Sequence, residues 1–443
     1  MNMASATNVA AKPIETRTIQ KLQFRLIPYL FLLYVVAMID RVNIGFAQLT
    51  MNKDLGLNGQ QYSTAAGIFF VGYFLFEVPS NLMLHKIGAR VWIARILLSW
   101  GLVASLTGLV QSVHQLYAAR VVLGFAEAGY YPGIVLYLTY WFRQRDQARV
   151  LALFLTGFAV NSVVGAPISG FILEHVHWMG MASWRWLFIL EGIPAIALGF
   201  LTYLLLPNRP SEAKFLTDDE KQWLRTELEA EEQLKQKHGR HSAWEGIKNP
   251  RVWHLMVIYF GMMIGSYTLS FFAPELVKSL STQYSNSVVG YLVTIPYLAA
   301  LAGMILVGRS SDRRMERRYH AAACLLLGGI GFLSLGVVHS PFVSIVLLSL
   351  LAIGYCSSLG PFWAMPSEFL TGFSAASGIA VINSVGNLGG FAGPFIVGFI
   401  KDKTGTLYGG LAFAGVSLLA ATLLVLLLPK AASVRVPGEM QAG

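Results

Sequence analysis

The chain has 443 residues, of which 55% are hydrophobic and only 13% charged, with a formal net charge of +10. This balance excludes an ordinary water-soluble domain, in which about a quarter of the residues are charged. The basic residues flank apolar segments, so we expect no nucleic-acid partner. The two cysteines, Cys324 and Cys356, both fall in apolar segments. Their positions indicate neither a disulfide framework nor a metal site.

Twelve apolar runs are long enough to cross the hydrocarbon core of a membrane, which takes about 20 helical residues. They cover residues 24–50, 61–84, 90–111, 114–140, 149–173, 184–206, 251–277, 288–310, 317–339, 341–365, 374–400 and 405–429. We therefore predict an all-α integral membrane protein with twelve transmembrane helices. One offset of 227 residues relates His85 to Asp312 and Pro167 to Pro394. It indicates two pseudo-symmetric six-helix halves.

Five segments follow from this pattern. We predict an N-terminal tail (1–23), a first six-helix half (24–206), a linker (207–250), a second six-helix half (251–430) and a C-terminal tail (431–443). The linker has a helix-start signature, because Thr217 is followed three residues later by Glu220. It therefore carries a short amphipathic helix.

The basic residues are distributed unevenly between the loops. Of the 33 Lys and Arg residues, 26 fall in or next to the termini and the even-numbered loops, and five fall in or next to the odd-numbered loops. The positive-inside rule then places both termini and the linker in the cytoplasm. Residues 1–23 contain no separate hydrophobic segment of a signal peptide. We expect a multi-pass protein of the inner (plasma) membrane.

The two remaining arginines lie inside predicted membrane helices, each near an acid. Arg41 follows Asp40 directly, and Arg120 lies seven residues before Glu127, on the same face of a helix. A charge at mid-bilayer costs about 2.5–3.5 kcal/mol, so such residues face protein or a water-filled cavity and are functional by default. Neighbouring helical residues point about 100° apart. Asp40 and Arg41 therefore face different surroundings.

Other polar and aromatic residues line the same predicted helices. Tyr73 and Glu77 lie in the second run, with Glu77 near its cytoplasmic end. Trp363 and Asn383 lie in the tenth and eleventh runs. The second half therefore contributes neutral polar and aromatic groups to any central cavity.

These motifs resemble the major facilitator superfamily and, within it, the anion:cation symporter family of tartrate, phthalate, galactonate and hydroxyphenylacetate permeases. The resemblance covers nearly all of residues 20–430. It is carried by Asp40-Arg41-x-Asn43-Ile44-Gly45, Gly72-Tyr73-x-x-x-Glu77-Val78-Pro79-Ser80-Asn81 and Arg120-x-x-x-Gly124-x-x-Glu127-Ala128. The loop signature of the superfamily is kept in Gly308 and Asp312-Arg313, whereas His85-Lys86 replaces Asp-Arg in the first half.

The resemblance implies a role for each candidate residue. Arg41 pairs with a substrate carboxylate, and Tyr73, Asn383, Arg120 and Trp363 belong to the same binding site. Asp40 and Glu127 are the proton-coupling acids, with Arg120 as the charge that interacts with Glu127. Glu77, Asp312 and Arg313 are gating or structural residues.

We therefore predict a proton-coupled symporter that carries a small organic anion, such as a hydroxy, sugar or aromatic acid, into the cell by alternating access. The sequence shows no nucleophile–base pair, metal-spaced cluster or phosphate-binding glycine loop, so we expect no enzyme. No cofactor is expected besides the coupling proton. The partners are the anion, the proton and the lipid bilayer, and the protein is a monomer. A uniporter of a neutral solute, a transporter-like sensor and coupling to sodium stay open as alternatives.

Overall fold

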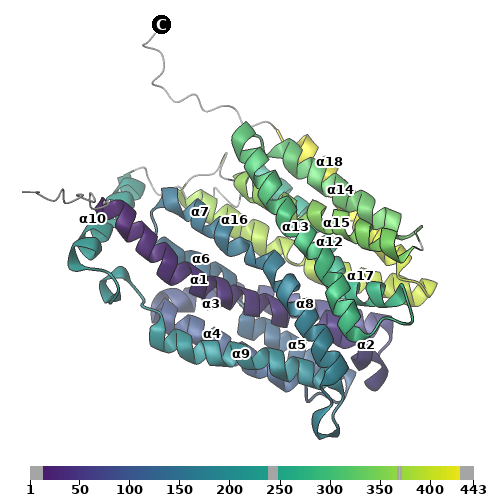
Figure 1. Cartoon of the computed structure of the whole chain (residues 1–443). Helices are drawn as coiled ribbons and strands as arrows, with labels where there is room; N and C mark the ends of the chain where they lie inside the picture. The colour runs from purple at the N-terminus through teal and green to yellow at the C-terminus, as the bar shows by residue number, and fades with distance from the viewer. Residues whose placement is uncertain (1–12, 238–247, 339, 367–368, 370–371, 430–443) are drawn as a thin grey trace, which may run out of the picture.

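The computed structural model describes residues 13–237, 248–338, 340–366, 369 and 372–429, and within these ranges every regular element is a helix (Figure 1). The predicted C-terminal tail (431–443) and residues 1–12 lie outside this part of the chain. α1 begins at Ile14, inside the segment predicted as an N-terminal tail. The boundaries of the halves and of the linker stay predictions.

The helices follow one another with short connections. The first half contains α1 (Ile14–Val42), α2 (Ile44–Asp54), α3 (Gly59–Ile87), α4 (Ala89–Thr107), α5 (Val113–Glu127), α6 (Tyr130–Thr139), α7 (Gln144–Leu155), α8 (Gly157–His175), η1 (Trp178–Gly180) and α9 (Ser183–Leu205). The linker contains η2 (Pro210–Glu212) and α10 (Asp218–Lys237). The second half contains α12 (Pro250–Ser279), α13 (Asn286–Arg314), α14 (Arg318–Leu335), α15 (Pro341–Ala364), α16 (Gly372–Gly386), α17 (Gly389–Thr404) and α18 (Tyr408–Leu427).

Twelve helical segments within the described residues are long and apolar enough to cross a membrane, so the predicted number of spans is confirmed. Three of these segments combine two helices. The break between α1 and α2 is at Asn43, and the break between α5 and α6 is at Ala128 and Gly129. Gly129 has a φ of +82°, which favours glycine. The break at Ala128 directly follows Glu127, and the break at Asn43 comes two residues after Arg41, as in the discontinuous helices that form binding sites in secondary transporters.

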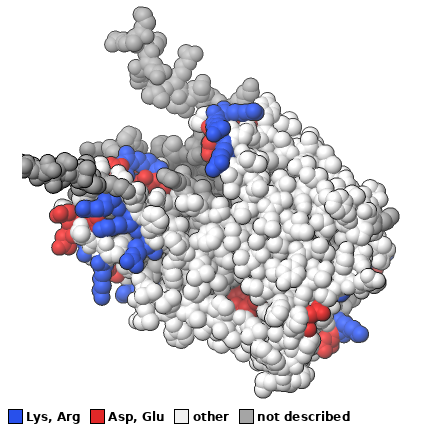
Figure 2. Space-filling view, in the orientation of Figure 1, with Lys and Arg blue, Asp and Glu red and all other residues white. Residues whose placement is uncertain are grey.

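The surface separates the charged residues from a broad belt that carries very few charges. Figure 2 shows one group of Lys and Arg side chains where α10 and the start of α1 lie in Figure 1, a second group at the upper end of the second half, and a smaller group near the opposite end. Large apolar side chains such as Phe200, Leu204 and Leu306 are exposed within spanning helices. We call the end with α10 the α10 end, and the end with residues 55–58, 176–182 and 280–285 the distal end. The belt between them matches a lipid-facing surface.

The two halves contact each other mainly towards the distal end, where α8 packs on α13, α3 on α17 and α2 on α12. Two carboxylates cap helices of the opposite half there. Glu174 of α8 accepts from the backbone N–H of Asn286 at the start of α13 (2.7 Å). Asp402 of α17 accepts from the N–H groups of Gly59 and Gln60 at the start of α3 (2.9 and 2.8 Å). Because acids stabilise helix N-termini, the two caps hold the distal end closed in a pseudo-symmetric manner.

The linker helix is tied to the start of α1. The helix start expected from Thr217 and Glu220 is present, since the Thr217 N–H donates to the Glu220 carboxylate (3.0 Å) and the Glu220 N–H donates to Thr217 Oγ1 (3.4 Å). The same carboxylate accepts hydrogen bonds from Arg17 (2.7 Å) and Lys21 (2.9 Å) of α1. These contacts explain why α1 extends back to Ile14.

Candidate functional site

Arg41 lies at the junction of the two halves, near the end of α1. Its side chain is 8% exposed, and Nη2 donates a hydrogen bond to Glu127, whose side chain is fully buried at the end of α5. Nη1 donates to the hydroxyl of Tyr267 in α12, at 3.3 Å. One guanidinium therefore joins an acid of the first half to a phenol of the second half.

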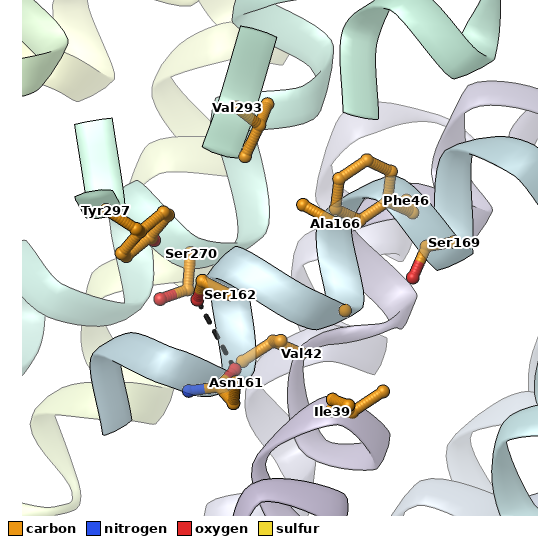
Figure 3. Close-up of a pocket in the computed structure, with 11 residues that line it drawn as sticks. Ile39, Val42, Phe46, Asn161, Ser162, Ala166, Ser169, Ser270, Val293 and Tyr297 are labelled. Carbon is orange, nitrogen blue, oxygen red and sulfur yellow. Dashed lines mark hydrogen bonds between the residues drawn. The ribbon is translucent and has the colours of Figure 1, made fainter. Parts of the chain in front are cut away.

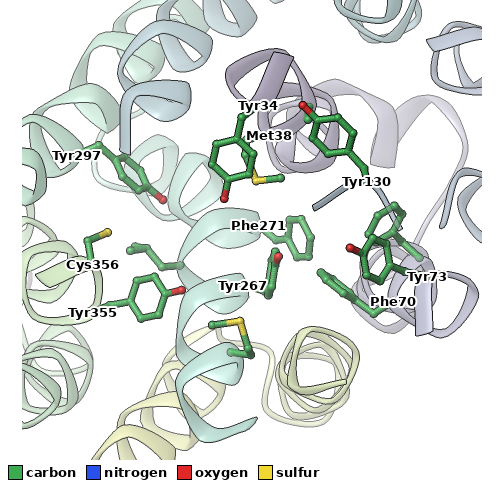
Figure 4. Close-up of a cluster of buried hydrophobic side chains, with 14 of the residues drawn as sticks. Tyr34, Met38, Phe70, Tyr73, Tyr130, Tyr267, Phe271, Tyr297, Tyr355 and Cys356 are labelled. Carbon is green, nitrogen blue, oxygen red and sulfur yellow. The ribbon is translucent and has the colours of Figure 1, made fainter. Parts of the chain in front are cut away.

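Aromatic rings surround this arginine. Its Cζ lies 5.3 Å from the ring centre of Phe69 and 5.2 Å from that of Tyr73, both in α3. Such distances allow cation–π attraction. Figure 4 shows Tyr73 and Phe70 on one side of Tyr267, with Tyr34 of α1 on another. The predicted neighbours Arg41 and Tyr73 are thus brought together.

Among the residues that the structure describes, Arg120 forms no hydrogen bond or ion pair with Glu127, and its predicted interaction with the charge of Glu127 stays a prediction. Arg120 is fully buried, and it donates to the carbonyl oxygens of Ala65 (3.2 Å) and Ala66 (3.4 Å) in α3. The hydrogen-bonded partner of Glu127 is Arg41. The reason is that a spacing along α5 says which residues share a face, but not which helix packs against that face.

Asp40 faces away from Arg41, as the angle between neighbouring helical residues predicts. Its Oδ2 accepts a hydrogen bond from Nε1 of Trp100 in α4, at 2.9 Å, and both residues are buried. Trp100 did not stand out in the sequence. An aromatic N–H donor inside an apolar run gives no signal unless its acceptor is known.

Glu77 and Asn383 form a second contact between the halves. Asn383 Nδ2 of α16 donates to the Glu77 carboxyl of α3 (3.1 Å), and the Ser384 hydroxyl donates to the same carboxyl (2.6 Å). The structure thus brings Asn383 to Glu77 by a direct hydrogen bond. Its predicted role in holding the substrate stays a prediction.

The other predicted residues lie at separate places. Trp363 of α15 packs on Tyr259, with ring centres 4.9 Å apart. Asp312, in the last turn of α13, forms an ion pair with Arg317 (2.5 Å), and Arg313 is exposed beside it. Both loop residues are at the α10 end, far from the centre of the bundle along α13. A gating role for them stays a prediction.

The sequence analysis missed a buried acid, Glu191 of α9. Its Oε1 accepts a hydrogen bond from the Ser169 hydroxyl of α8 at 2.6 Å, and the residue is 5% exposed. The signal was available, because a single acid inside the apolar run 184–206 has the same meaning as Asp40 in the first run. Among the residues that the structure describes, no group of three His, Cys, Asp or Glu side chains could hold a metal ion.

Comparisons with known proteins agree with this architecture. The family model of the Major Facilitator Superfamily matches residues 30–394 and, in a second match, 255–442. The chain belongs to the major facilitator superfamily. Proteins of this superfamily are transporters and not enzymes, as the sequence predicted.

Two relatives align over nearly the whole chain. The chain is 45% identical to a protein of Agrobacterium vitis named "Putative tartrate transporter", over 95% of this chain and 96% of the relative. It is 40% identical to the "Putative metabolite transport protein NicT" of Pseudomonas putida, over 92% and 93% of the two chains. These relatives are consistent with an anion transporter of the superfamily.

Solved structures show the same fold. The partially occluded inward-open form of the xylose transporter XylE from E. coli superposes with a TM-score of 0.73, over 92% of this chain and 99% of that chain. The sequences are 16% identical, so the likeness shows the fold alone. The predicted fold class of this chain is confirmed.

Proposed function

We propose that the protein is a proton-coupled symporter that carries a small organic anion across the inner membrane into the cell. The observation that supports this function best is the buried pair of Arg41 and Glu127. An arginine binds a carboxylate through two parallel hydrogen bonds and keeps its charge when buried. Inside a membrane it is therefore a suitable receptor for an organic acid.

The pair also provides a means of coupling. In this structure Glu127 accepts the hydrogen bond that a substrate carboxylate would accept from Arg41. A proton on Glu127 removes its negative charge and frees the arginine for the anion. The proton and the anion therefore bind together, and each favours the binding of the other.

Alternating access requires that both halves respond to the bound anion. Arg41 belongs to the first half and contacts Tyr267 of the second half, so a ligand on the arginine changes a contact between them. The distal end is closed by Glu174 and Asp402. With the α10 end and both termini in the cytoplasm, the closed distal end is the one that faces outward. Rocking of the halves would open the distal end.

The substrate class follows from the chemistry around Arg41 and from the relatives. Phe69, Tyr73 and Tyr267 provide aromatic faces and hydroxyl groups beside the guanidinium. Such a site accepts a small carboxylate that carries hydroxyl groups or a ring. The name of the Agrobacterium vitis relative makes tartrate the first acid to examine. The bilayer, the anion and the proton are the partners proposed for a monomeric carrier that needs no cofactor.

Uptake of labelled carboxylates into proteoliposomes, with and without an imposed pH gradient, tests this function. The panel contains tartrate, galactonate, phthalate and hydroxyphenylacetate, with glucose as a neutral control. We expect one acid to accumulate only while the gradient is present. Arg41→Gln should abolish uptake, and Arg41→Lys should lower it about 10- to 100-fold, because lysine keeps the charge but loses the bidentate geometry. Equilibration of glucose without accumulation of any acid would contradict the proposal.

A further inference from the structure

The membrane-spanning part of the structure contains more buried acids than buried cations. Among its described residues, the buried ionisable acids are Asp40, Glu77, Glu127 and Glu191, and the buried arginines are Arg41 and Arg120. An unpaired charge in such surroundings costs several kcal/mol. The two arginines can offset two of the four carboxylates, which leaves two carboxyls whose negative charge no buried arginine offsets.

Asp40 and Glu191 are the acids with the fewest compensating contacts, because Glu77 accepts hydrogen bonds from both Asn383 and Ser384. Within the described residues, no ion pair includes either of them, whereas Glu127 pairs with Arg41. Asp40 accepts one hydrogen bond from the neutral indole of Trp100, and Glu191 accepts one from the neutral hydroxyl of Ser169. Each of these acids keeps a second carboxyl oxygen that is buried and has no hydrogen-bond partner among the residues described.

The two carboxyls lie on segments that pack together. Trp100, which donates to Asp40, is followed in α4 by Gly101, and a Cβ atom on Gly101 would lie 2.9 Å from the carbonyl oxygen of Gly192, the residue after Glu191. Asn43, one helical turn after Asp40, lies against the Glu191 carboxyl and is 1% exposed. Its amide oxygen and nitrogen have no partner at normal hydrogen-bond geometry. Asp40, Asn43 and Glu191 thus form one buried polar cluster between α1 and α9.

A small cavity with several polar groups in its wall adjoins this cluster at Ser169. Ser169, which donates to Glu191, also lines a cavity of about 20 Å³ between α8, the α1–α2 junction, α12 and α13 (Figure 3). Asn161, Ser162 and Tyr297 provide further polar groups in its wall. This volume holds about one water molecule. Ser169 therefore connects Glu191 to a cavity at the interface of the two halves.

We propose that Asp40 and Glu191 form a second proton-binding site, separate from Arg41 and Glu127, in which the charge of one buried carboxyl sets the pH at which the other is protonated. Two neighbouring carboxyls in a buried site do not ionise together, and they titrate as a pair. Glu191 sets the pH range over which Asp40 carries the coupling proton, although it touches no substrate. The inference rests on the proposed proton-coupled transport.

The test uses the full-length protein with Glu191→Gln, which keeps the shape and removes the ionisable group. The pH profile of gradient-driven anion uptake is measured in proteoliposomes, with anion counterflow at equal pH on both sides as a measure of folded, substrate-competent carrier. We expect counterflow within about twofold of the wild type. The pH at which gradient-driven uptake falls to half should decrease by about one unit, because Asp40 loses its proton more easily without a competing carboxylate.

Two further variants separate this role from a structural one. Glu191→Asp keeps an ionisable carboxyl and should restore most of the wild-type pH profile. A structural role of Glu191 would not depend on the presence of an ionisable group. Glu229→Gln changes an exposed acid of α10 and should leave the profile unchanged. If Glu191→Gln lowers counterflow, a second variant tests the second site. Ser169→Ala keeps both carboxyls but removes the hydrogen-bond donor to Glu191, and its pH profile is then compared with that of the wild type. We expect it to shift the half-maximal pH as well.

The outcomes distinguish the two proposals. A wild-type protein whose uptake ignores the pH gradient contradicts both the symport and the second site. Gradient-driven uptake in the wild type, with unchanged profiles in Glu191→Gln and Ser169→Ala, contradicts the second site alone. A dependence on a sodium gradient that Glu191→Gln removes would show that the cluster binds Na⁺, and it would overturn the assignment to a proton.

Discussion

Asn383 donates a hydrogen bond of 3.1 Å to the carboxyl of Glu77, which lies 306 residues earlier in the chain. Both side chains are buried. Glu77 is one helical turn beyond Tyr73 towards the α10 end. The contact therefore joins the halves on the α10 side of Arg41, whereas Glu174 and Asp402 join them at the distal end. The halves are therefore joined on both sides of the proposed binding site, more extensively at the distal end.

Breaking the Glu77–Asn383 contact should open the α10 end. We expect Glu77→Ala and Asn383→Ala to widen the distance between spin labels at Leu82 of α3 and Ile379 of α16, both of which are exposed. The double variant should widen it no further than Glu77→Ala alone, because Glu77→Ala already removes the hydrogen bonds from both Asn383 and Ser384. Pulsed electron–electron double resonance measures the distance between the two labels. Additive effects would show that Asn383 acts independently of Glu77, as a substrate contact would.

Replacing Glu127 by glutamine should separate binding from coupling. The amide resembles the protonated acid, so Arg41 stays available to the anion at every pH. We expect the Glu127→Gln variant to keep anion exchange. Its accumulation of the anion driven by a pH gradient should fall at least tenfold. Counterflow and gradient-driven uptake measure the two properties in the same proteoliposomes. Loss of exchange together with accumulation would instead assign Glu127 a structural role.

The closed distal end depends on a close approach between α8 and α13. A Cβ atom on Gly290 would lie 2.5 Å from the carbonyl oxygen of Ala166, which is closer than real contacts allow. Gly290→Ala should therefore destabilise the closed state by about 1–3 kcal/mol, the usual cost of overpacking. Spin labels at the exposed residues Met179 and Gln283 should then report a larger distal separation.

The control for this experiment lies in the same helix. Gly308 of α13 has no atom within 4 Å of the position that a Cβ would occupy, so Gly308→Ala should leave the distal distance unchanged. An equal response of the two variants would mean that a general effect on α13, and not the contact with α8, controls the distal end.

The spans and the unusual positions of Asp40 and Arg41 could be predicted because they depend on local sequence. An apolar run of membrane length predicts a helix wherever it lies, and a charge inside it stands out at once. The start of α10 at Thr217 and Glu220 was equally local, since both partners lie within one helical turn.

The partners of these residues could not be predicted in the same way. The choice of Glu127 between Arg41 and Arg120 depends on how α1 and α3 pack against α5, which no spacing within α5 determines. The bond between Asn383 and Glu77 depends on the relative position of the two halves, which no local pattern determines. Glu191 could have been found from the sequence, because an acid inside an apolar run stands out. Only the identity of its neighbours required the structure.

The contact of Glu220 with α1 predicts a dependence of stability on pH outside the membrane. Burial alone would raise the pKa of Glu220, but hydrogen bonds from Lys21, from the backbone N–H of Thr217 and from Arg17 outweigh it and lower the pKa below the ordinary value of 4.5. A group whose pKa is lower in the folded state stabilises the protein above its unfolded pKa. That contribution is lost as the pH falls through the lower, folded pKa.

Thermal unfolding of the detergent-solubilised wild type and of Glu220→Gln measures this contribution. We expect the wild type to be more stable by about 1 kcal/mol at pH 7, a modest value because Arg17 and Lys21 remain partly exposed. The difference should shrink below pH 4.5 and vanish once Glu220 is protonated in the folded protein. Glu229→Gln, which breaks an exposed pair with Arg225 in the same helix, should change the stability little at either pH. A difference between wild type and Glu220→Gln that persists in acid would show that Glu220 stabilises α10 through packing and not through its charge.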